Sequence, residues 1–362
     1  MVFPRENCRC VAGDAQRGRG LDDGVRTKPL GQDLNGDFGR YLGLFASQSK
    51  GSHAICPHAL DLDEAGMIPK IYLTRIFAAG PDGGNPAPIV MDAAGLSDAQ
   101  MQEIARGYGH ESGFVLPAPV ASDCDFALRF WVPNHEMEMC GHATVGAVWL
   151  LDHLGRLPRD HVSIWTRSGR VEARVAERNA FGNRVEITQP QGRVDPLADA
   201  ESAKTEILSV LGIASNALAP SPIRNACTSR IKTLVPLNSV ATLDGLRPNF
   251  QRVEQVCDRI GSTGLYPYAV ADLAGQVFDA RQFPKSSGYP EDAATGIAAA
   301  ALVFGLLESG LVERTDRPIR VRQGRAMGCP SEIVLRLCMN GDDVQCCWLG
   351  GSVQLMETLV MR

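Results

Sequence analysis

The sequence lacks the features that mark membrane and nucleic-acid-binding proteins. No apolar run reaches the roughly 18 to 20 residues needed to cross a bilayer, because the longest, residues 297–307, is short and is interrupted by Gly305. Lys and Arg do not cluster, and the formal net charge is -5, so no basic surface is available to neutralise a phosphate backbone. We therefore expect neither a membrane nor a nucleic acid as a partner.

Metal-binding and hydrolase signatures are absent as well. The 11 cysteines form no CxxC pair and no Cys/His cluster at zinc-finger spacing, which argues against a disulfide scaffold or a structural zinc site. Neither GxSxG nor HExxH occurs, and the Gly-rich loop at residues 80–86 matches no phosphate-binding pattern. We expect reduced thiols in a cytoplasmic protein that needs no metal.

The remaining composition is that of a globular protein. The 362 residues are 44% hydrophobic and 21% charged, enough for one large or two medium domains. Residues 1–66 differ, because they show neither helical nor strand periodicity and carry acids as well as bases. We expect this extension to be disordered and dispensable, with Met67 at or near the natural start.

From residue 70 onward, short alternating strands are separated by turn signals, which predicts a strand-rich α+β fold. Strands are expected at residues 70–77, 87–91 and 114–116. Between the second and third, Ser97 is a candidate N-cap for an amphipathic helix over residues 98–108.

A weak internal repeat is the most informative feature of the chain. Pro133 precedes Cys140 by nearly the same spacing as Pro284 precedes Asp292, and each copy continues into an apolar run of small residues. Each copy fits a strand, a polar turn and then the start of a helix that is apolar all round and therefore buried. The repeat predicts two pseudo-symmetric lobes, each a β-sheet or barrel wrapped around a central helix.

Two buried helix starts have a chemical consequence. Their unpaired N–H groups and positive dipole ends, facing each other across a cleft, would hold a carboxylate without any Lys or Arg. The repeat places Cys140 and Asp292 at these two termini. A thiol or carboxyl group beside a substrate carbon, with charge held by backbone N–H groups, suits proton abstraction next to a carbonyl.

The motifs of the chain, in their order, resemble those of the PhzF-type phenazine-biosynthesis isomerases, which share the diaminopimelate epimerase-like fold. The resemblance covers roughly residues 70–362 and rests on the motifs Gly84-Asn85-Pro86-Ala87, His110-Glu111-Ser112-Gly113-Phe114-Val115, Cys140-Gly141-His142-Ala143-Thr144, Glu291-Asp292-Ala293-Ala294-Thr295-Gly296, Gln323-Gly324, Met327-Gly328 and Gly350-Gly351.

This resemblance implies a cofactor-independent isomerase, commonly a homodimer, that acts on a small-molecule carboxylate between its two lobes. Glu111 would be the proton shuttle, with a pKa raised by burial, and His142 and Asp292 would flank the substrate and support developing charge. The family's best-defined substrate is trans-2,3-dihydro-3-hydroxyanthranilate. The positions implied to bind substrate are Gly141, Thr295 and Gly296.

Two other functions stay open. In the related epimerases both repeat positions are Cys, so the pair Cys140 and Asp292 leaves room for an amino-acid epimerase or racemase, and a helix N-terminus would lower the Cys140 pKa. The third hypothesis is a metabolite-binding protein without catalysis.

The expected lobe boundaries follow from the repeat. The first lobe is expected to comprise residues 67–189 plus 345–362, and the second residues 190–344. Within the second lobe, residues 190–260, Arg224 to Thr228 among them, are expected to shape specificity.

Overall fold

The computed structural model describes residues 69–179 and 182–360. The expected disorder of residues 1–66 therefore lies outside the described residues. The first three predicted strands are confirmed as β1 (Lys70–Ile76), β2 (Asn85–Met91) and β3 (Ser112–Pro117). Their side chains are mostly buried.

The predicted helix and its cap are confirmed in α2 (Asp98–Tyr108). The Gln100 backbone N–H donates to Ser97 Oγ, and the Ser97 N–H donates to Gln100 Oε1 at 2.8 Å, which forms a capping box. Gly109 ends the helix with a φ of 69°, a left-handed conformation that glycine adopts at little cost.

The first lobe is built around α3. Its strands pair in the order β1–β2 antiparallel, β2–β3 parallel, β3–β4 antiparallel, β4–β6 parallel, and β6–β7 and β7–β8 antiparallel. The further elements of this lobe are η1 (Ala93–Gly95), β4 (Phe126–Trp131), β5 (Glu136–Met137), α3 (Gly141–His153), β6 (His161–Thr166), β7 (Gly169–Asn179), β8 (Gly182–Pro190) and β18 (Val353–Val360).

The second lobe, built around α7, repeats this pairing. Its strands pair in the order β10–β11 antiparallel, β11–β12 parallel, β12–β13 antiparallel, β13–β15 parallel, and β15–β16 and β16–β17 antiparallel. The predicted α+β class and internal repeat are thereby confirmed. Its elements are β9 (Arg193–Pro196), α4 (Ala200–Leu211), η2 (Ser215–Ala217), β10 (Arg224–Cys227), β11 (Ile231–Leu237), α5 (Val240–Asp244), α6 (Phe250–Arg259), β12 (Gly264–Asp272), β13 (Val277–Ala280), β14 (Phe283–Pro284), α7 (Gly296–Glu308), β15 (Ile319–Gln323), η3 (Arg325–Met327), β16 (Ser331–Asn340) and β17 (Asp343–Gly351).

The lobes are joined by exchanged strands. After β8 the chain enters β9, which pairs with β10, and after β17 it returns in β18, which pairs with β1. Strand β17 itself pairs with both β16 and β8, so hydrogen-bonded strands run without a break from one lobe to the other. The lobe boundaries stay a prediction, and we propose Ser352, between β17 and β18, in place of the boundary between residues 344 and 345.

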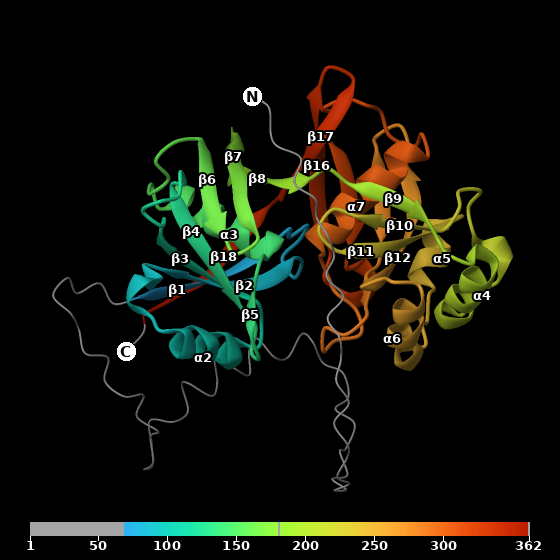
Figure 1. The fold of residues 1–362 in the computed structure, drawn as a ribbon, viewed down its shortest axis with the longest axis horizontal. Coiled ribbons are helices and arrows are strands. Elements are labelled where there is room, and N and C mark those ends of the chain that lie inside the picture. Colours follow the sequence, from blue (N-terminus) through green and yellow to red (C-terminus); the bar gives the residue numbers. More distant parts are fainter. Residues whose placement is uncertain (1–68, 180–181, 361–362) are drawn as a thin grey trace, which may run out of the picture. The chain divides into compact units, whose positions relative to one another are not determined.

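The two central helices are buried on all sides, as their sequences predict. Residues 142–151 of α3 and residues 298–306 of α7 are buried, and the two helices contact each other. Figure 1 shows α3 among β1 to β8 and α7 beside β10 to β12. A second apolar cluster lies between the α4 and α6 pair and the other face of β11 and β12.

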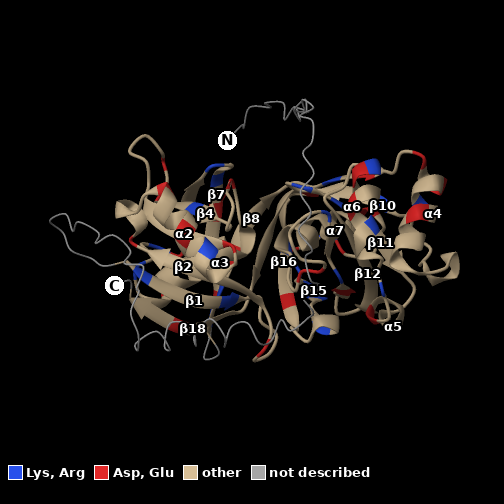
Figure 2. Cartoon of the chain, turned by 90° about the horizontal axis from the view of Figure 1, so that it is seen from below, with Lys and Arg blue, Asp and Glu red and all other residues tan. Residues whose placement is uncertain are grey.

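Charges of both signs occur in both lobes in the view of Figure 2. Within the described ranges, no helix is long and apolar enough to cross a membrane. Over the same two ranges, no group of three or more His, Cys, Asp and Glu side chains is arranged to hold a metal ion.

Candidate active site

Three side chains of the first lobe meet at the start of α3. Glu111 immediately precedes β3, Cys140 is the N-cap of α3, and His142 lies in its first turn. Glu111 Oε2 lies 3.8 Å from His142 Nε2, and Cys140 Sγ lies 3.3 Å from His142 Nδ1. The imidazole therefore stands between the carboxyl group and the thiol, and the Glu111 side chain keeps 22% exposure through which a substrate can reach it.

Burial shifts the pKa values of Glu111 and His142 in opposite directions. It raises the pKa of Glu111 above its ordinary value, as expected from the sequence, although a backbone hydrogen bond and the charges of His110 and Arg230 oppose the rise. It lowers the pKa of His142 to about 4, so the imidazole is neutral at pH 7. The Glu111 carboxyl group thus has an increased affinity for a proton and lies beside a neutral histidine.

The expected lowering of the Cys140 pKa by the helix terminus is wrong. Burial raises the pKa of this thiol well above its ordinary value, and the negative charge of Glu111 adds to the rise. The N–H groups of Ala143 and His142 act in the opposite direction but do not compensate. Cys140 is therefore a thiol at neutral pH, and a thiol is a poor base.

Asp292 is the acidic group of the second lobe. Its Oδ1 accepts a hydrogen bond of 3.0 Å from Asn85 Nδ2, and its Oδ2 accepts one from Thr295 Oγ1. Burial raises the pKa of Asp292 to about 6, the Thr295 hydroxyl opposes the rise, and Glu111 adds to it. Because Asn85 begins β2, its hydrogen bond ties the first lobe to the acidic group of the second.

The predicted position of Asp292 at the helix terminus needs a correction. The N-cap of α7 is Thr295, and the helix begins at Gly296. The Asp292 backbone N–H instead donates to the Gln282 carbonyl at 3.1 Å, in an isolated antiparallel bridge. The chain is therefore still in a β bridge at Asp292, and the residue equivalent to Cys140 is Thr295.

The four predicted catalytic residues lie in one site. Asp292 interacts electrostatically with Glu111 and His142, and the Asp292 charge also raises the pKa of Cys140. Of the three predicted substrate-binding positions, Gly141 and Gly296 are the first residues of α3 and α7, and Thr295 is the cap already described.

Four further residues at this site were not assigned a role from the sequence. Asn85 and Gln323 belong to the motifs quoted above, and Gln323 Oε1 accepts from Tyr266 Oη at 2.9 Å while its Nε2 donates to the Asp292 carbonyl at 2.6 Å. Tyr289 has a pKa raised by burial and by the charges of Asp292 and Glu111. Lys232, also in the field of Asp292, carried no motif that would have identified it.

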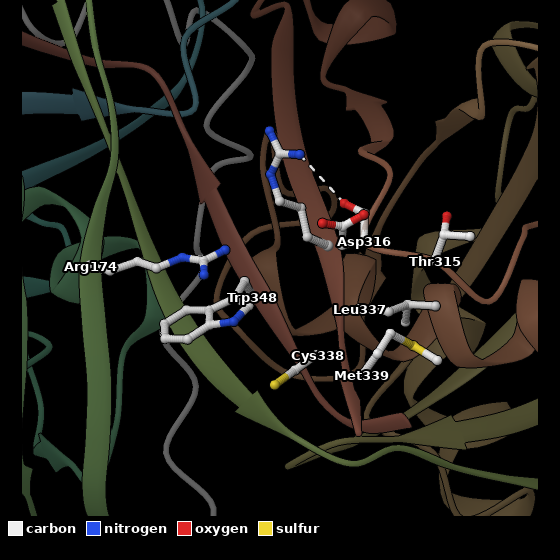
Figure 3. A pocket seen from close by; sticks show the side chains of 8 residues that line it. Arg174, Thr315, Asp316, Leu337, Cys338, Met339 and Trp348 are labelled. Carbon is white, nitrogen blue, oxygen red and sulfur yellow. Dashed lines mark hydrogen bonds between the residues drawn. The ribbon is translucent and has the colours of Figure 1, made fainter. Parts of the chain in front are cut away.

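A pocket of about 480 Å³ lies elsewhere, on β16 and β17 (Figure 3). In it the Arg174 guanidinium lies 4.1 Å from the centre of the Trp348 ring, and Arg336 Nη1 contacts the Asp316 carbonyl at 3.5 Å. Both arginines also pair with Glu186, and Arg336 pairs with Glu177 as well. None of the predicted site residues lines this pocket, so we place the active site at the starts of α3 and α7.

Comparison with known proteins gives one consistent result. The family model of phenazine biosynthesis-like proteins, PhzC-PhzF, matches residues 74–357. An uncharacterized isomerase, YddE, of Salmonella typhimurium is 31% identical over 269 residues, 72% of this chain and 88% of that protein. The trans-2,3-dihydro-3-hydroxyanthranilate isomerase of Pseudomonas chlororaphis is 29% identical over 261 residues, 72% of this chain and 87% of that enzyme.

A solved structure shares the fold. The crystal structure of a Bacillus anthracis phenazine biosynthesis protein of the PhzF family superposes with a TM-score of 0.70 at 24% sequence identity. The match covers 82% of this chain and 100% of that one. The strand order and the paired central helices described above are therefore those of a known architecture.

Proposed function

This chain belongs to the phenazine biosynthesis-like PhzC-PhzF family of isomerases, and from that premise we propose that it moves a proton between two carbon atoms of a small cyclic or unsaturated carboxylate. The observation that carries the proposal is the pairing of Glu111 with His142. A partly buried carboxyl group with a raised pKa, 3.8 Å from a neutral imidazole, is suited to accept a proton and return it.

Glu111 acts first as the base and then as the acid. It removes a proton from one carbon and delivers it to another, and the raised pKa increases its affinity for the proton that it must hold between the two steps. His142 and Asp292 flank the substrate and support the charge that develops on it, while Gly141, Thr295 and Gly296 bind it. Because these groups come from both lobes, the substrate would be held between the starts of α3 and α7.

The first substrate to test is trans-2,3-dihydro-3-hydroxyanthranilate, the compound in the name of the Pseudomonas chlororaphis relative. We also expect a homodimer in the cytoplasm that needs no cofactor. Light scattering of the purified protein tests the dimer, and activity after exhaustive dialysis against a chelator tests the independence from metal.

An amino-acid epimerase or racemase is the second candidate, with Cys140 and Asp292 as opposed bases. The favourable observation is that the two groups share one electrostatic environment. The raised pKa of Cys140 counts against it, because the thiolate is the form that abstracts a proton. A third candidate is metabolite binding without catalysis.

Proton NMR of the full-length protein in deuterated buffer separates these candidates. The protein is incubated with the dihydro-hydroxyanthranilate and with a panel of amino and hydroxy acids, alongside the Glu111→Gln and Cys140→Ala variants. We expect isomerisation of an unsaturated carboxylate that is lost in Glu111→Gln and kept in Cys140→Ala. A single shuttle can retain the substrate proton, whereas two opposed bases draw deuterium from solvent.

Two results would contradict the isomerase. Exchange of an α-proton that is lost only in Cys140→Ala would assign the chain to epimerase chemistry. Binding of a metabolite, with no chemical change in wild type or in Glu111→Gln, would favour the non-catalytic protein.

A further inference from the structure

Lys232 and Gln282 are two buried polar side chains of the second lobe near Asp292. Lys232 on β11 is 5% exposed, and its ammonium makes no hydrogen bond or ion pair with any residue in the described ranges. Gln282 is 1% exposed, and neither its Nε2 nor its Oε1 has a hydrogen-bond partner there. Buried polar groups are normally paired, since leaving them unpaired destabilises the fold. Both residues therefore need an explanation.

The strand register shows which way Lys232 points. It lies directly opposite Ala226 of β10, which is buried in the core around α7. Leu234, two residues further along β11, packs against α7, because a Cβ on Gly305 would lie 2.3 Å from Leu234 Cδ1. Opposite residues share a face of a sheet, as do residues two apart in one strand. Lys232 therefore points to the α7 side.

Gln282 lies on the same side, next to Lys232. Extending the parallel register of β11 and β12, in which Thr233 pairs with Leu265, sets Lys232 beside Gly264. A Cβ on Gly264 would lie 2.3 Å from Gln282 Nε2. The missing side chain of Gly264 thus leaves the space that the Gln282 amide fills, one strand away from Lys232.

Both groups adjoin the acidic residue of the site. The Gln282 carbonyl accepts the Asp292 backbone N–H at 3.1 Å, and Lys232 interacts electrostatically with the Asp292 carboxyl. At the other end of α7, Arg224 pairs with Glu308 and lies opposite Leu234. Lys232, closer to the β10–β11 turn, is therefore displaced from that end of α7 toward the end that carries the site.

We propose that Lys232 and Gln282 form a subsite for the carboxylate of the substrate. The inference rests on the proposed function, and it names the group that holds the carboxylate away from the proton shuttle. An ammonium and an amide N–H both donate, which is what a carboxylate oxygen requires. Burial lowers the pKa of Lys232 to about 8, so the side chain is still mostly cationic at pH 7.

Charge balance supports the same assignment. A carboxylate substrate enters a site that contains two acidic side chains, Glu111 and Asp292. His142 does not offset them, because its pKa of about 4 leaves it neutral. Arg230 acts on Glu111, and Lys232 is a buried cation in the field of Asp292. Binding of the carboxylate would also give the buried ammonium a hydrogen-bonded ion pair.

Calorimetric titration of the full-length protein tests the subsite. The probes are anthranilate and its neutral isostere 2-aminobenzamide, with benzoate and benzamide as a second pair. In Lys232→Met we expect the affinity for the carboxylates to fall about 10- to 100-fold, the loss typical of a charged hydrogen bond, and the affinity for the amides to change little. Lys285→Met is the matched control, because Lys285 already has an ion pair with Asp258, and it should bind all four probes like wild type.

Thermal unfolding separates a binding role from a structural one. If Lys232 is kept for a ligand, Lys232→Met removes an unpaired buried charge and melts at or above the wild-type temperature. A lower melting temperature with unchanged discrimination between acid and amide would overturn the subsite. So would a wild-type protein that binds no carboxylate more tightly than its amide.

The two proposals fail in different ways. If the protein isomerises a carboxylate and Lys232→Met has an unchanged KM, the subsite is wrong and the isomerase stands. If carboxylate binding depends on Lys232 but no compound in the deuterated-buffer panel exchanges or shifts a proton, the subsite stands and the isomerase is wrong.

Discussion

The two lobes share one order of strand pairing and one buried helix, yet they carry different chemistry. At the start of α3 the chain reads Cys140, Gly141, His142, and at the start of α7 it reads Thr295, Gly296, Ile297. The first lobe supplies the proposed proton shuttle, a glutamate whose pKa burial raises, and an imidazole that burial keeps neutral. In the second lobe an acid, a lysine and an amide surround the same site. A repeated scaffold therefore fixes where the site lies, and side-chain identity decides what each half does.

The acidic groups differ in how they are held. Asp292 accepts hydrogen bonds from Asn85 and Thr295, so its position is set by both lobes. Glu111 has the imidazole at 3.8 Å, a looser contact than a hydrogen bond. A group that must carry a proton between two carbons needs that freedom, whereas a group that supports charge benefits from being fixed.

The largest loss of activity is expected for a substitution of Glu111, the proposed base of the first lobe. Glu111→Gln keeps the size of the side chain and removes the base, so kcat should fall about 10²- to 10⁴-fold, with little change in melting temperature. The NMR assay in deuterated buffer measures it. Thr263→Gln, at the equivalent position before β12, is the matched control, and a comparable loss there would refute the division of roles.

Removing the charge of the second lobe should cost less. Asp292→Asn keeps the hydrogen bond to Thr295 in altered form and lowers kcat/KM about 10- to 100-fold, the range for a hydrogen bond to a charged group. Steady-state kinetics measure the loss. An effect as large as that of Glu111→Gln would indicate that the acid of the second lobe is itself a proton-transfer group.

The joint between the lobes can be tested by stability. A Cβ on Gly350 of β17 would lie 2.2 Å from the Val185 carbonyl oxygen of β8. We expect Gly350→Ala to lower the free energy of unfolding by about 3 kcal/mol, as overpacking against backbone does, in a urea titration. Gly95→Ala, with no atom within 4 Å of the added group, should leave stability within about 0.5 kcal/mol. Equal urea midpoints of unfolding for the two variants would show that β8 moves to accommodate the added methyl group at little cost in stability.

A fall in pH should change the contributions of His142 and Asp292 to stability in opposite directions. The folded-state pKa of His142, about 4, lies below its unfolded value, so its contribution to stability is present above about pH 6.5 and is lost as the pH falls toward 4. The folded-state pKa of Asp292, about 6, lies above its unfolded value, so its contribution is present below about pH 4 and is lost as the pH rises through 6.

Urea titrations between pH 4 and pH 7 test this opposition. Relative to wild type, His142→Gln should gain about 1 to 2 kcal/mol as the pH is lowered, and Asp292→Asn should gain a similar amount as it is raised. Wild-type stability should vary less than that of either variant. Parallel profiles for all three proteins would contradict the assigned protonation states.

The smallest effect is expected at Cys140. Because burial keeps the group a thiol, Cys140→Ser should change kcat by less than about threefold in a proton-shuttle enzyme. The same NMR assay measures it, with Cys257→Ser, a buried cysteine on α6, as the control for packing. A loss of several orders of magnitude at Cys140 alone would move the chain to the two-base mechanism.

Local sequence patterns were enough for much of the fold. Short strand patterns between turn signals located β1, β2 and β3, and Ser97, as a candidate N-cap, marked the start of α2. The nearly equal spacing from Pro133 to Cys140 and from Pro284 to Asp292 predicted the internal repeat. However, the spacing predicted the start of the second helix at the wrong residue. Asp292 forms a β-bridge with Gln282, and the N-cap of the helix is Thr295.

The sequence by itself determined the class of fold, the two central helices and the start of the first of them at Cys140, because these depend on neighbours within a few turns of chain. Only the tertiary structure decided the proton affinities of Glu111, His142 and Cys140, the tie from Asn85 to Asp292 across 207 positions, and the approach of Lys232 to the site. Each of these depends on which distant strands exclude water or supply a partner. Burial and long-range register are properties of the assembled sheet, and no local pattern encodes them.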